Sequence, residues 1–277
     1  MAAPMQDCIL LMGDSLTQRT DSPGNLQQRM NEAYQRKLDI LNRGYGGFNS
    51  EWFVPLLPKI LARKEDADKV PVIRLVTIWL GTNDSVIGRD QSQSTSRLVS
   101  NLEIILDALT SPESPYAVAS TPVSIILMTP GPCVVSDMPK ENQKYRTAEK
   151  HREYRDAVIE VGEKYKALEE ENNARLGDRY GWKIATADVW QELMSAAAGD
   201  NEQELSSLFI DGVHLSTKGY TVVWDLLARI IKTEFKGRGL DWEDFDDLPR
   251  RVPPFTDIDF SNPPSVVDLM ALPKIRQ

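Results

Sequence analysis

The strongest constraint on the fold is a nearly unbroken apolar run at residues 72–80, VIRLVTIWL. Such a run has no polar face to offer water, so it predicts a central parallel strand covered on both sides. Shorter apolar runs lie before and after it, and the segments between them space apolar residues three and four apart, as helices do. This alternation predicts an α/β fold, a three-layer α/β/α sandwich with a mostly parallel central sheet. The other expected strands are residues 9–12, 39–42, 123–128 and 182–187, and the expected helices are residues 25–37, 50–63, 95–109, 141–176, 189–198 and 216–235.

The composition shifts near residue 236, which suggests a boundary. Residues 1–235 carry the alternating pattern and are expected to form one catalytic domain, since 41% apolar content over 277 residues is enough for a full core. Residues 236–277 are acidic, rich in proline and without clear periodicity. The alternatives are a solvated, partly disordered tail and an extended strap packed on the domain or on a second subunit, which would make a homodimer. The aromatic content of the segment favours the strap. The aromatic residues are Trp242, Phe245, Phe255 and Phe260.

Charge and hydropathy indicate which kinds of partner and which cellular compartment to expect for this chain. The chain has 32 Lys and Arg against 41 Asp and Glu, a net charge of −9, and no basic stripe, which argues against binding nucleic acid. No apolar run approaches the roughly 18 residues that span a bilayer, and no basic segment typical of a signal peptide precedes the first strand. Cys8 and Cys133 are expected to be buried thiols in a reducing cytoplasm. With only four Cys and His in total, scattered along the chain, no metal site is expected.

The chain has only two histidines, and they fall in different surroundings. His214 ends the segment Asp211-Gly212-Val213-His214, whereas His151 stands between Lys150 and Arg152 and is expected on the solvated side of a helix. The inner face of that helix, residues 141–176, is expected to be Tyr154, Val158, Val161, Tyr165 and Leu168.

Four polar or glycine segments are expected at the carboxyl ends of strands, where parallel sheets bind their ligands. Each has an ordinary structural explanation on its own. Ser15 could belong to a helix cap, Gly46-Gly47 could be a tight turn, Asn83 could bond its own loop, and His214 could be structural. Together they supply a hydroxyl, an imidazole with a nearby carboxylate at Asp211, and candidate donors for an oxyanion. Those are the parts that a serine hydrolase needs.

The order and wording of these segments resemble the GDSL, or SGNH, hydrolase family, and most of all its isoamyl acetate-hydrolysing esterase branch. The resemblance covers roughly residues 7–235 and implies the flavodoxin-like α/β/α fold of that family, with no cofactor and no metal. Gly-Asp-Ser does not match the Gly-x-Ser-x-Gly elbow of α/β-hydrolases, which makes that fold the weaker alternative. The matching blocks are residues 13–17, GDSLT; 42–49, NRGYGGFN; 80–84, LGTND; and 211–216, DGVHLS.

The resemblance also assigns roles. It implies that Ser15 is the nucleophile, that His214 is the general base and then acid, and that Asp211 orients it. It further implies an oxyanion hole formed by the backbone N–H groups of Ser15 and Gly47 and by the side-chain amide of Asn83; Gly47 is preferred to the preceding glycine from the alignment of the second block.

The expected activity is hydrolysis of small, short-acyl carboxylic esters through an acyl-serine intermediate. The alternatives within enzymes are a lysophospholipase or thioesterase with a longer acyl pocket, and a carbohydrate acetylesterase. The alternative of another class is a non-catalytic binding protein on the same fold. The polar segment 85–96 is expected to line the substrate pocket.

Overall fold

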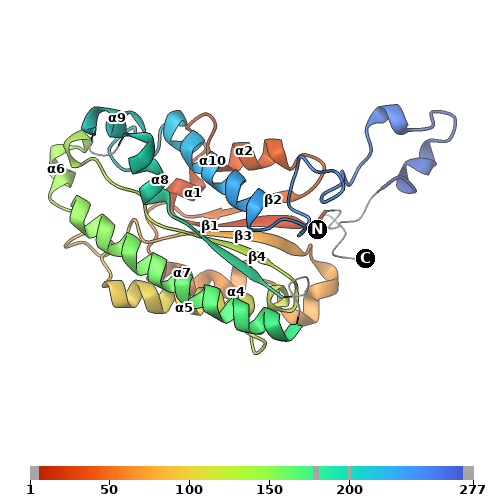
Figure 1. Ribbon diagram of the computed structural model, residues 1–277, viewed down its shortest axis with the longest axis horizontal. Coiled ribbons are helices and arrows are strands. Elements are labelled where there is room, and N and C mark those ends of the chain that lie inside the picture. The colour runs from red at the N-terminus through yellow and green to blue at the C-terminus, as the bar shows by residue number, and fades with distance from the viewer. Residues whose placement is uncertain (1–5, 177–180, 199–200, 271–277) are drawn as a thin grey trace.

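The computed structural model describes residues 6–176, 181–198 and 201–270, and it has the expected three-layer α/β/α architecture (Figure 1). The central sheet has five strands, all parallel, in the order β2-β1-β3-β4-β5. The chain therefore builds the sheet outward in one direction from β1 to β2 and then in the other from β3 to β5, with the reversal between β1 and β3. The strands are β1 (Cys8–Gly13), β2 (Asp39–Gly44), β3 (Ile73–Trp79), β4 (Ser124–Met128) and β5 (Lys183–Ala187).

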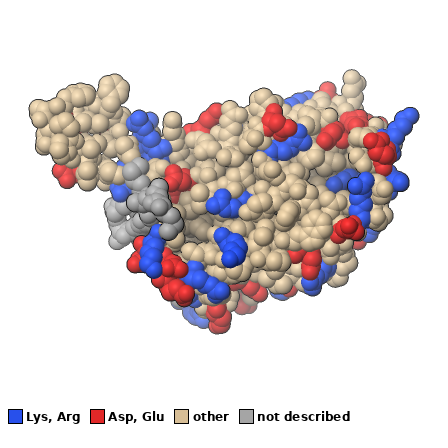
Figure 2. Space-filling view, turned by 180° about the vertical axis from the view of Figure 1, so that it is seen from behind, with Lys and Arg blue, Asp and Glu red and all other residues tan. Residues whose placement is uncertain are grey.

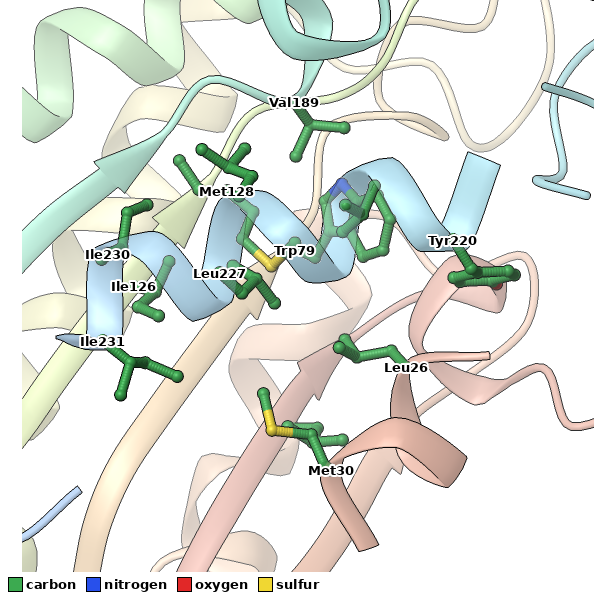
Figure 3. Packing of buried hydrophobic residues seen from close by; sticks show 14 of the residues in the cluster. Leu26, Met30, Trp79, Ile126, Met128, Val189, Tyr220, Leu227, Ile230 and Ile231 are labelled. Atoms are coloured by element: carbon green, nitrogen blue, oxygen red, sulfur yellow. The ribbon is translucent and has the colours of Figure 1, made fainter. Parts of the chain in front are cut away.

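Both faces of the sheet are covered, as the apolar runs predict. Side chains alternate across a strand, so Ile9 and Leu11 of β1 pack into the core on one face, and Leu10 and Met12 pack into the core on the other. Figure 3 shows the first of these cores, in which Leu227 of helix α10 (Thr217–Thr233) lies beside Met128 of β4. Helices α2 (Leu26–Ala33), α8 (Val189–Ala196) and α10 (Thr217–Thr233) cover this face, whereas α5 (Thr95–Thr110) and α7 (Ala148–Leu176) cover the opposite face (Figure 1).

Two expected helices are interrupted. Residues 50–63 form α3 (Ser50–Phe53) and α4 (Leu57–Ile60), joined by a 3₁₀ turn (Val54–Leu56), because prolines at 55 and 58 lack the N–H that a continuous helix requires. Residues 141–176 divide into the short α6 (Lys140–Gln143) and the long α7.

The expectation for His151 was wrong. Its side chain is buried, with 1% exposure, and it lies on the inner face of α7 three residues before Tyr154 and seven before Val158. That spacing follows the helical period, whereas the charged neighbours of His151 in sequence point elsewhere. Leu168, expected on the same inner face, is 40% exposed.

The segment that follows α10 packs against the domain up to about residue 250 and then extends away from it. Leu240 and Leu248 are buried, and the ring of Trp242 lies 5.5 Å from that of Tyr34. Beyond Pro254 the chain projects from one end of the molecule (Figure 1), where Phe255 and Phe260 are exposed. Figure 2 shows this arm as largely uncharged, while charges of both signs are interspersed over the visible face of the body.

Candidate active site

The topology brings the segments singled out in the sequence to one edge of the sheet. In the parallel register Gly13 of β1 pairs with Gly44 of β2 on one side and with Trp79 of β3 on the other. Ser15 follows β1 directly, so it lies between the turn that follows β2 and the loop that follows β3. This is also the point where the strand order reverses, the usual ligand site of open parallel sheets.

Ser15, His214 and Asp211 form a hydrogen-bonded chain. Ser15 Oγ lies 2.9 Å from His214 Nε2, and His214 Nδ1 lies 2.7 Å from Asp211 Oδ2. Ser15 opens the short helix α1 (Ser15–Gln18), and Asp14 caps it by accepting a 2.9 Å hydrogen bond from Leu16 N–H. The three side chains thus have the order and spacing of a nucleophile, a base and an orienting carboxylate.

The loop before α10 is built to hold Asp211 ionised beside His214. Oδ1 of Asp211 accepts hydrogen bonds from the backbone N–H groups of Val213 and His214. Burial alone would raise the pKa of Asp211, but these bonds and the His214 ring outweigh it and hold the pKa well below its usual value. Gly212, between them, has φ +79°, and its carbonyl accepts a hydrogen bond from Val134 N–H.

The structure separates Gly46 from Gly47 as candidate oxyanion donors. The N–H of Gly46 donates to the side-chain oxygen of Gln18. By contrast, the N–H groups of Gly47 and Ser15 donate to no other residue in the described part of the chain. Gly47 lines the same cleft as Ser15, and its φ of +79° is a conformation that favours glycine.

Asn83 is held at the same edge. Its Nδ2 donates a 2.9 Å hydrogen bond to the carbonyl of Phe48, and the other hydrogen on that nitrogen has only a long contact, 3.5 Å, with Asp14 Oδ2. The amide thus lines the cleft with a strong hydrogen bond to Phe48 and a weak one to Asp14, and a ligand oxygen would replace the weak one.

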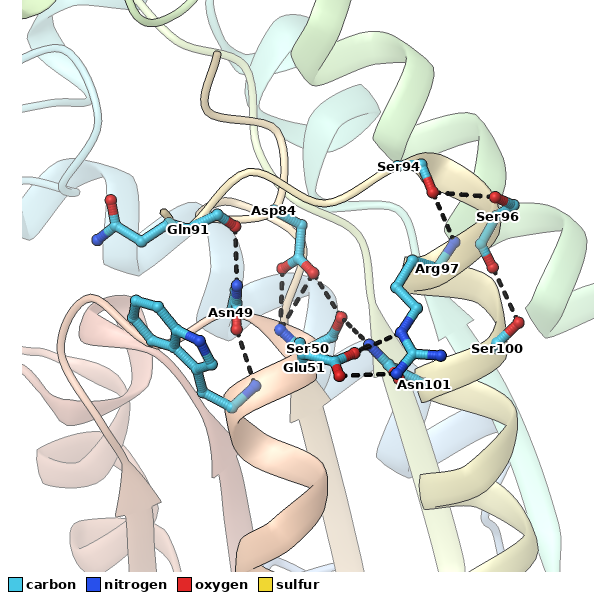
Figure 4. A network of polar contacts seen from close by, with 11 residues as sticks. Asn49, Ser50, Glu51, Asp84, Gln91, Ser94, Ser96, Arg97, Ser100 and Asn101 are labelled. Atoms are coloured by element: carbon cyan, nitrogen blue, oxygen red, sulfur yellow. Dashed lines mark hydrogen bonds and ion pairs between the residues drawn. The ribbon is translucent and has the colours of Figure 1, made fainter. Parts of the chain in front are cut away.

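Two buried acids lie beneath the candidate site. Burial raises the pKa of Asp14 to about 7 and that of Asp84 to about 6. Asp84 accepts hydrogen bonds from the backbone and hydroxyl of Ser50 at the start of α3, within a polar network that continues to Asn101 and Arg97 of α5 (Figure 4). The network ties the loop after β3 to two helices and so fixes the backbone that carries Asn83.

A cleft of about 450 Å³ opens above these residues. Ser15, Gly47, Asn83, Asp211 and His214 all contribute to its wall. The rest of the wall comes mainly from two segments, residues 82–91 and 138–146, and the first of these confirms that part of the polar segment 85–96 lines the pocket.

Two arginines in this wall, Arg89 and Arg146, were not found from the sequence. Nη1 of Arg146 donates to the carbonyl of Thr82 and lies 3.1 Å from Nε2 of His151, and Nη2 donates to Asn83 Oδ1 at 3.4 Å. Burial and the adjacent guanidinium lower the pKa of His151 to about 3, so this histidine is neutral, and its other nitrogen bonds the carbonyl of Gly131. One sequence signal could have pointed to Arg146: His151 falls on the inner face of the helical pattern, and a buried histidine needs a polar partner.

The described residues contain no group of three or more His, Cys, Asp or Glu that could hold a metal ion. In the same residues, no helix is long and apolar enough to cross a membrane. Cys8 and Cys133 are both buried, as expected.

An α/β/α fold with Ser15, His214 and Asp211 at one edge of its sheet defines a class of protein, the hydrolases that use a serine. Comparison with known proteins agrees with this class. A family model described as GDSL-like lipase/acylhydrolase matches residues 9–227. The chain belongs to this family and is a carboxylic ester hydrolase.

Individual proteins of known name are also similar to this chain. The isoamyl acetate-hydrolyzing esterase of Saccharomyces cerevisiae is 27% identical over 239 residues, covering 81% of this chain and 85% of that protein. The human isoamyl acetate-hydrolyzing esterase 1 homolog is 28% identical over 232 residues, covering 81% of this chain and 83% of its own. Among solved structures, a lipase/acylhydrolase from Enterococcus faecalis shares the fold with a TM-score of 0.55 at 18% identity, over 83% of this chain and 97% of that one.

Proposed function

We propose that the protein hydrolyses small, short-acyl carboxylic esters with Ser15 as nucleophile, His214 as general base and then acid, and Asp211 as the orienting carboxylate. The observation that carries this proposal is the continuous chain from Ser15 Oγ through His214 to Asp211, with distances of 2.9 and 2.7 Å. A serine hydroxyl is too weakly acidic to attack unaided, so the imidazole takes its proton as the bond to the ester carbon forms.

The reaction then proceeds in two halves. Ser15 Oγ adds to the ester carbonyl, the tetrahedral intermediate collapses, and His214 returns the proton to the leaving alcohol. Water, deprotonated by the same imidazole, then attacks the acyl-serine, and His214 returns that proton to Ser15 Oγ as the bond to the serine breaks and the acid leaves. In each half, the N–H groups of Ser15 and Gly47 and the side-chain amide of Asn83 would stabilise the oxyanion; removing one such donor typically costs about 3–4 kcal/mol.

The acyl length is proposed from the relatives and the cleft. Two relatives that align over more than four fifths of the chain are named for isoamyl acetate, an ester with a two-carbon acyl group. The two buried thiols favour the cytoplasm as the compartment. A homodimer stays a prediction, for which the exposed Phe255 and Phe260 offer a surface.

Covalent labelling tests the nucleophile. A fluorophosphonate probe is expected to add once to the intact protein, as read by mass, and not to the Ser15→Ala variant. Equal labelling of both proteins would show that Ser15 is not the nucleophile. An absence of labelling, together with no turnover of any ester, would favour the non-catalytic alternative.

Turnover of p-nitrophenyl acetate, butyrate and decanoate tests the acyl group. We expect kcat/KM to fall from acetate to decanoate. A clear optimum at decanoate would instead support a lysophospholipase or thioesterase, and release of acetate from acetylated glycans without turnover of simple acetates would support a carbohydrate acetylesterase.

A further inference from the structure

The cleft wall is positively charged although the chain as a whole carries a net charge of −9. Arg89 and Arg146 both line the cleft. Among the described residues one carboxylate lines it, that of Asp211, which is engaged by His214 and two backbone N–H groups. Lys144 does not line the cleft, but its Nζ lies 4.8 Å from the centre of the ring of Tyr145, which does. An excess of positive charge in a concave site raises the local concentration of anions.

Arg146 has no ionised partner at contact distance. Within the described residues no carboxylate oxygen lies within 4.0 Å of its guanidinium, and its hydrogen-bond partners, Thr82, His151 and Asn83, are all neutral acceptors. These bonds use both hydrogens of Nη1 and one of Nη2. The Nε–H and the second Nη2–H donate to no described residue, and a partly buried charge with free donors is a favourable place for an anion.

Arg89 stands at the outer part of the same wall. Its guanidinium lies 3.9 Å above the ring of Tyr145 and donates a 3.2 Å hydrogen bond to Asn142. It too has no carboxylate oxygen within 4.0 Å in the described chain. The ring and the amide hold the guanidinium in place but leave its charge uncompensated. Asp90 and Glu141 belong to the same two segments, but neither lines the cleft.

We propose that Arg89 and Arg146 form an anion subsite and that the natural substrate is a short ester carrying a carboxylate a few atoms from the scissile bond. This inference rests on the proposed esterase function and makes it more specific. A carboxylate fits because its two oxygens can accept a pair of parallel N–H bonds from one guanidinium. Arg146 also donates to Asn83, so the subsite is directly joined to the proposed oxyanion donor.

Matched ester pairs test the subsite on both sides of the scissile bond. On the alcohol side, 3-acetoxypropanoate is compared with isoamyl acetate, in which a branched methyl pair replaces the carboxylate oxygens. On the acyl side, monomethyl succinate is compared with methyl 4-methylpentanoate for the same reason. In one of the two pairs we expect kcat/KM for the anionic ester to exceed that of its neutral partner about 10- to 100-fold, the usual effect of hydrogen bonds to a charged group. The pair that responds identifies which half of the substrate carries the charge.

Variants assign that preference to the arginines. Arg89→Gln and Arg146→Gln should each lower the ratio of kcat/KM between the anionic and neutral esters by about tenfold or more. Arg250→Gln, which removes an exposed charge in the segment after α10, should leave the ratio unchanged. Thermal unfolding of each variant confirms that it is folded.

The outcomes separate this inference from the proposed function. If isoamyl acetate is hydrolysed through Ser15 but neither anionic ester is preferred, the subsite is wrong and the esterase stands. If either arginine variant lowers kcat/KM equally for both esters of the responding pair, that guanidinium only supports the structure and the proposed subsite is wrong. If no ester is turned over and Ser15 is not labelled, both proposals fail together.

Discussion

Nη1 of Arg146 and Nε2 of His151 lie 3.1 Å apart, with the histidine buried and the arginine exposed to the cleft. The imidazole supports the guanidinium from behind, because its other nitrogen is fixed on the carbonyl of Gly131. The two histidines of this chain therefore have different tasks: His214 contacts Ser15, whereas His151 positions Arg146.

Replacement of His151 should show this supporting role. His151→Ala removes two buried hydrogen bonds and leaves a cavity, so we expect the free energy of unfolding to fall by about 2–4 kcal/mol in urea denaturation. The pKa of His151 is lowered, so its contribution is present above pH 6.5 and is lost as the pH falls towards 3. The deficit of the variant should therefore shrink as the solution is acidified. A deficit that grows with acid would contradict a neutral, buried imidazole.

Substitution of the proposed base, His214, should lower activity more than substitution of its carboxylate partner, Asp211. His214→Ala should abolish turnover and leave the fold intact, since the other histidine is committed elsewhere. Asp211→Asn keeps an oxygen for the backbone N–H groups but no longer favours the correct tautomer, so kcat should fall about 10³- to 10⁴-fold. Steady-state kinetics beside circular dichroism measure both effects. Activity near that of the wild type in His214→Ala would overturn the mechanism.

Asp14 should make stability depend on pH in an unusual direction. Its pKa is raised by burial to about 7, so the folded state holds this proton more tightly than the unfolded state does. Stability is therefore lost as the pH rises from about 4 to about 7. Asp14→Asn retains the oxygen that caps α1 and cannot ionise. Relative to the wild type, the variant should gain stability over that window, with a slope approaching about 1.4 kcal/mol per pH unit. Urea denaturation at several pH values measures the slope, and parallel curves would show that Asp14 is not buried as an acid.

Two glycines with the same backbone conformation provide a matched pair. Gly212 has φ +79° and Gly237 has φ +78°. A Cβ at Gly212 would lie 2.2 Å from the carbonyl oxygen of Val134, whereas a Cβ at Gly237 would meet nothing within 4 Å. Gly237→Ala should cost only the conformational penalty of about 1–2 kcal/mol and leave kcat unchanged. Gly212→Ala should cost more and should also lower kcat, because the clash displaces the backbone between Asp211 and His214. Equal effects of the two substitutions on both quantities would argue against the clash.

The end of the folded domain is a further prediction. We propose that it lies near residue 250 rather than at 235, since Leu240 and Leu248 are buried and Trp242 packs on Tyr34. Trp242→Ala should lower the free energy of unfolding by about 2–4 kcal/mol. A chain ending after Pro254 should lose less than about 0.5 kcal/mol, whereas a chain ending after Phe235 should not fold. Cooperative unfolding of the chain that ends after Phe235 would show that the domain ends near residue 235.

The sequence predicted those features that depend on residues near each other in the chain. The apolar runs specify the inner strands β1, β3 and β4, because burial on both faces requires consecutive apolar residues. The edge strands β2 and β5 are only partly buried and follow from the alternation of strands and helices. The blocks around Ser15, Asn83 and His214 are each contiguous. His151 was misplaced because its immediate neighbours are charged, although the helical period places it inside. The roles of Arg146 and Arg89 depend on how residues 82–91 and 138–146 meet across the cleft, and no local pattern encodes that meeting.

The packing of the segment after α10 has a consequence for synthesis. Tyr34, in the first eighth of the chain, donates its hydroxyl hydrogen bond to the carbonyl of Leu240, 206 residues later, and Arg238 donates to Ser124 across 114 residues. Contacts between residues so far apart form late in folding, because a long loop must close before they contribute. A ribosome makes Leu240 206 residues after Tyr34. The core around Tyr34 therefore stays incompletely covered until the segment that holds Arg238 and Leu240 has emerged.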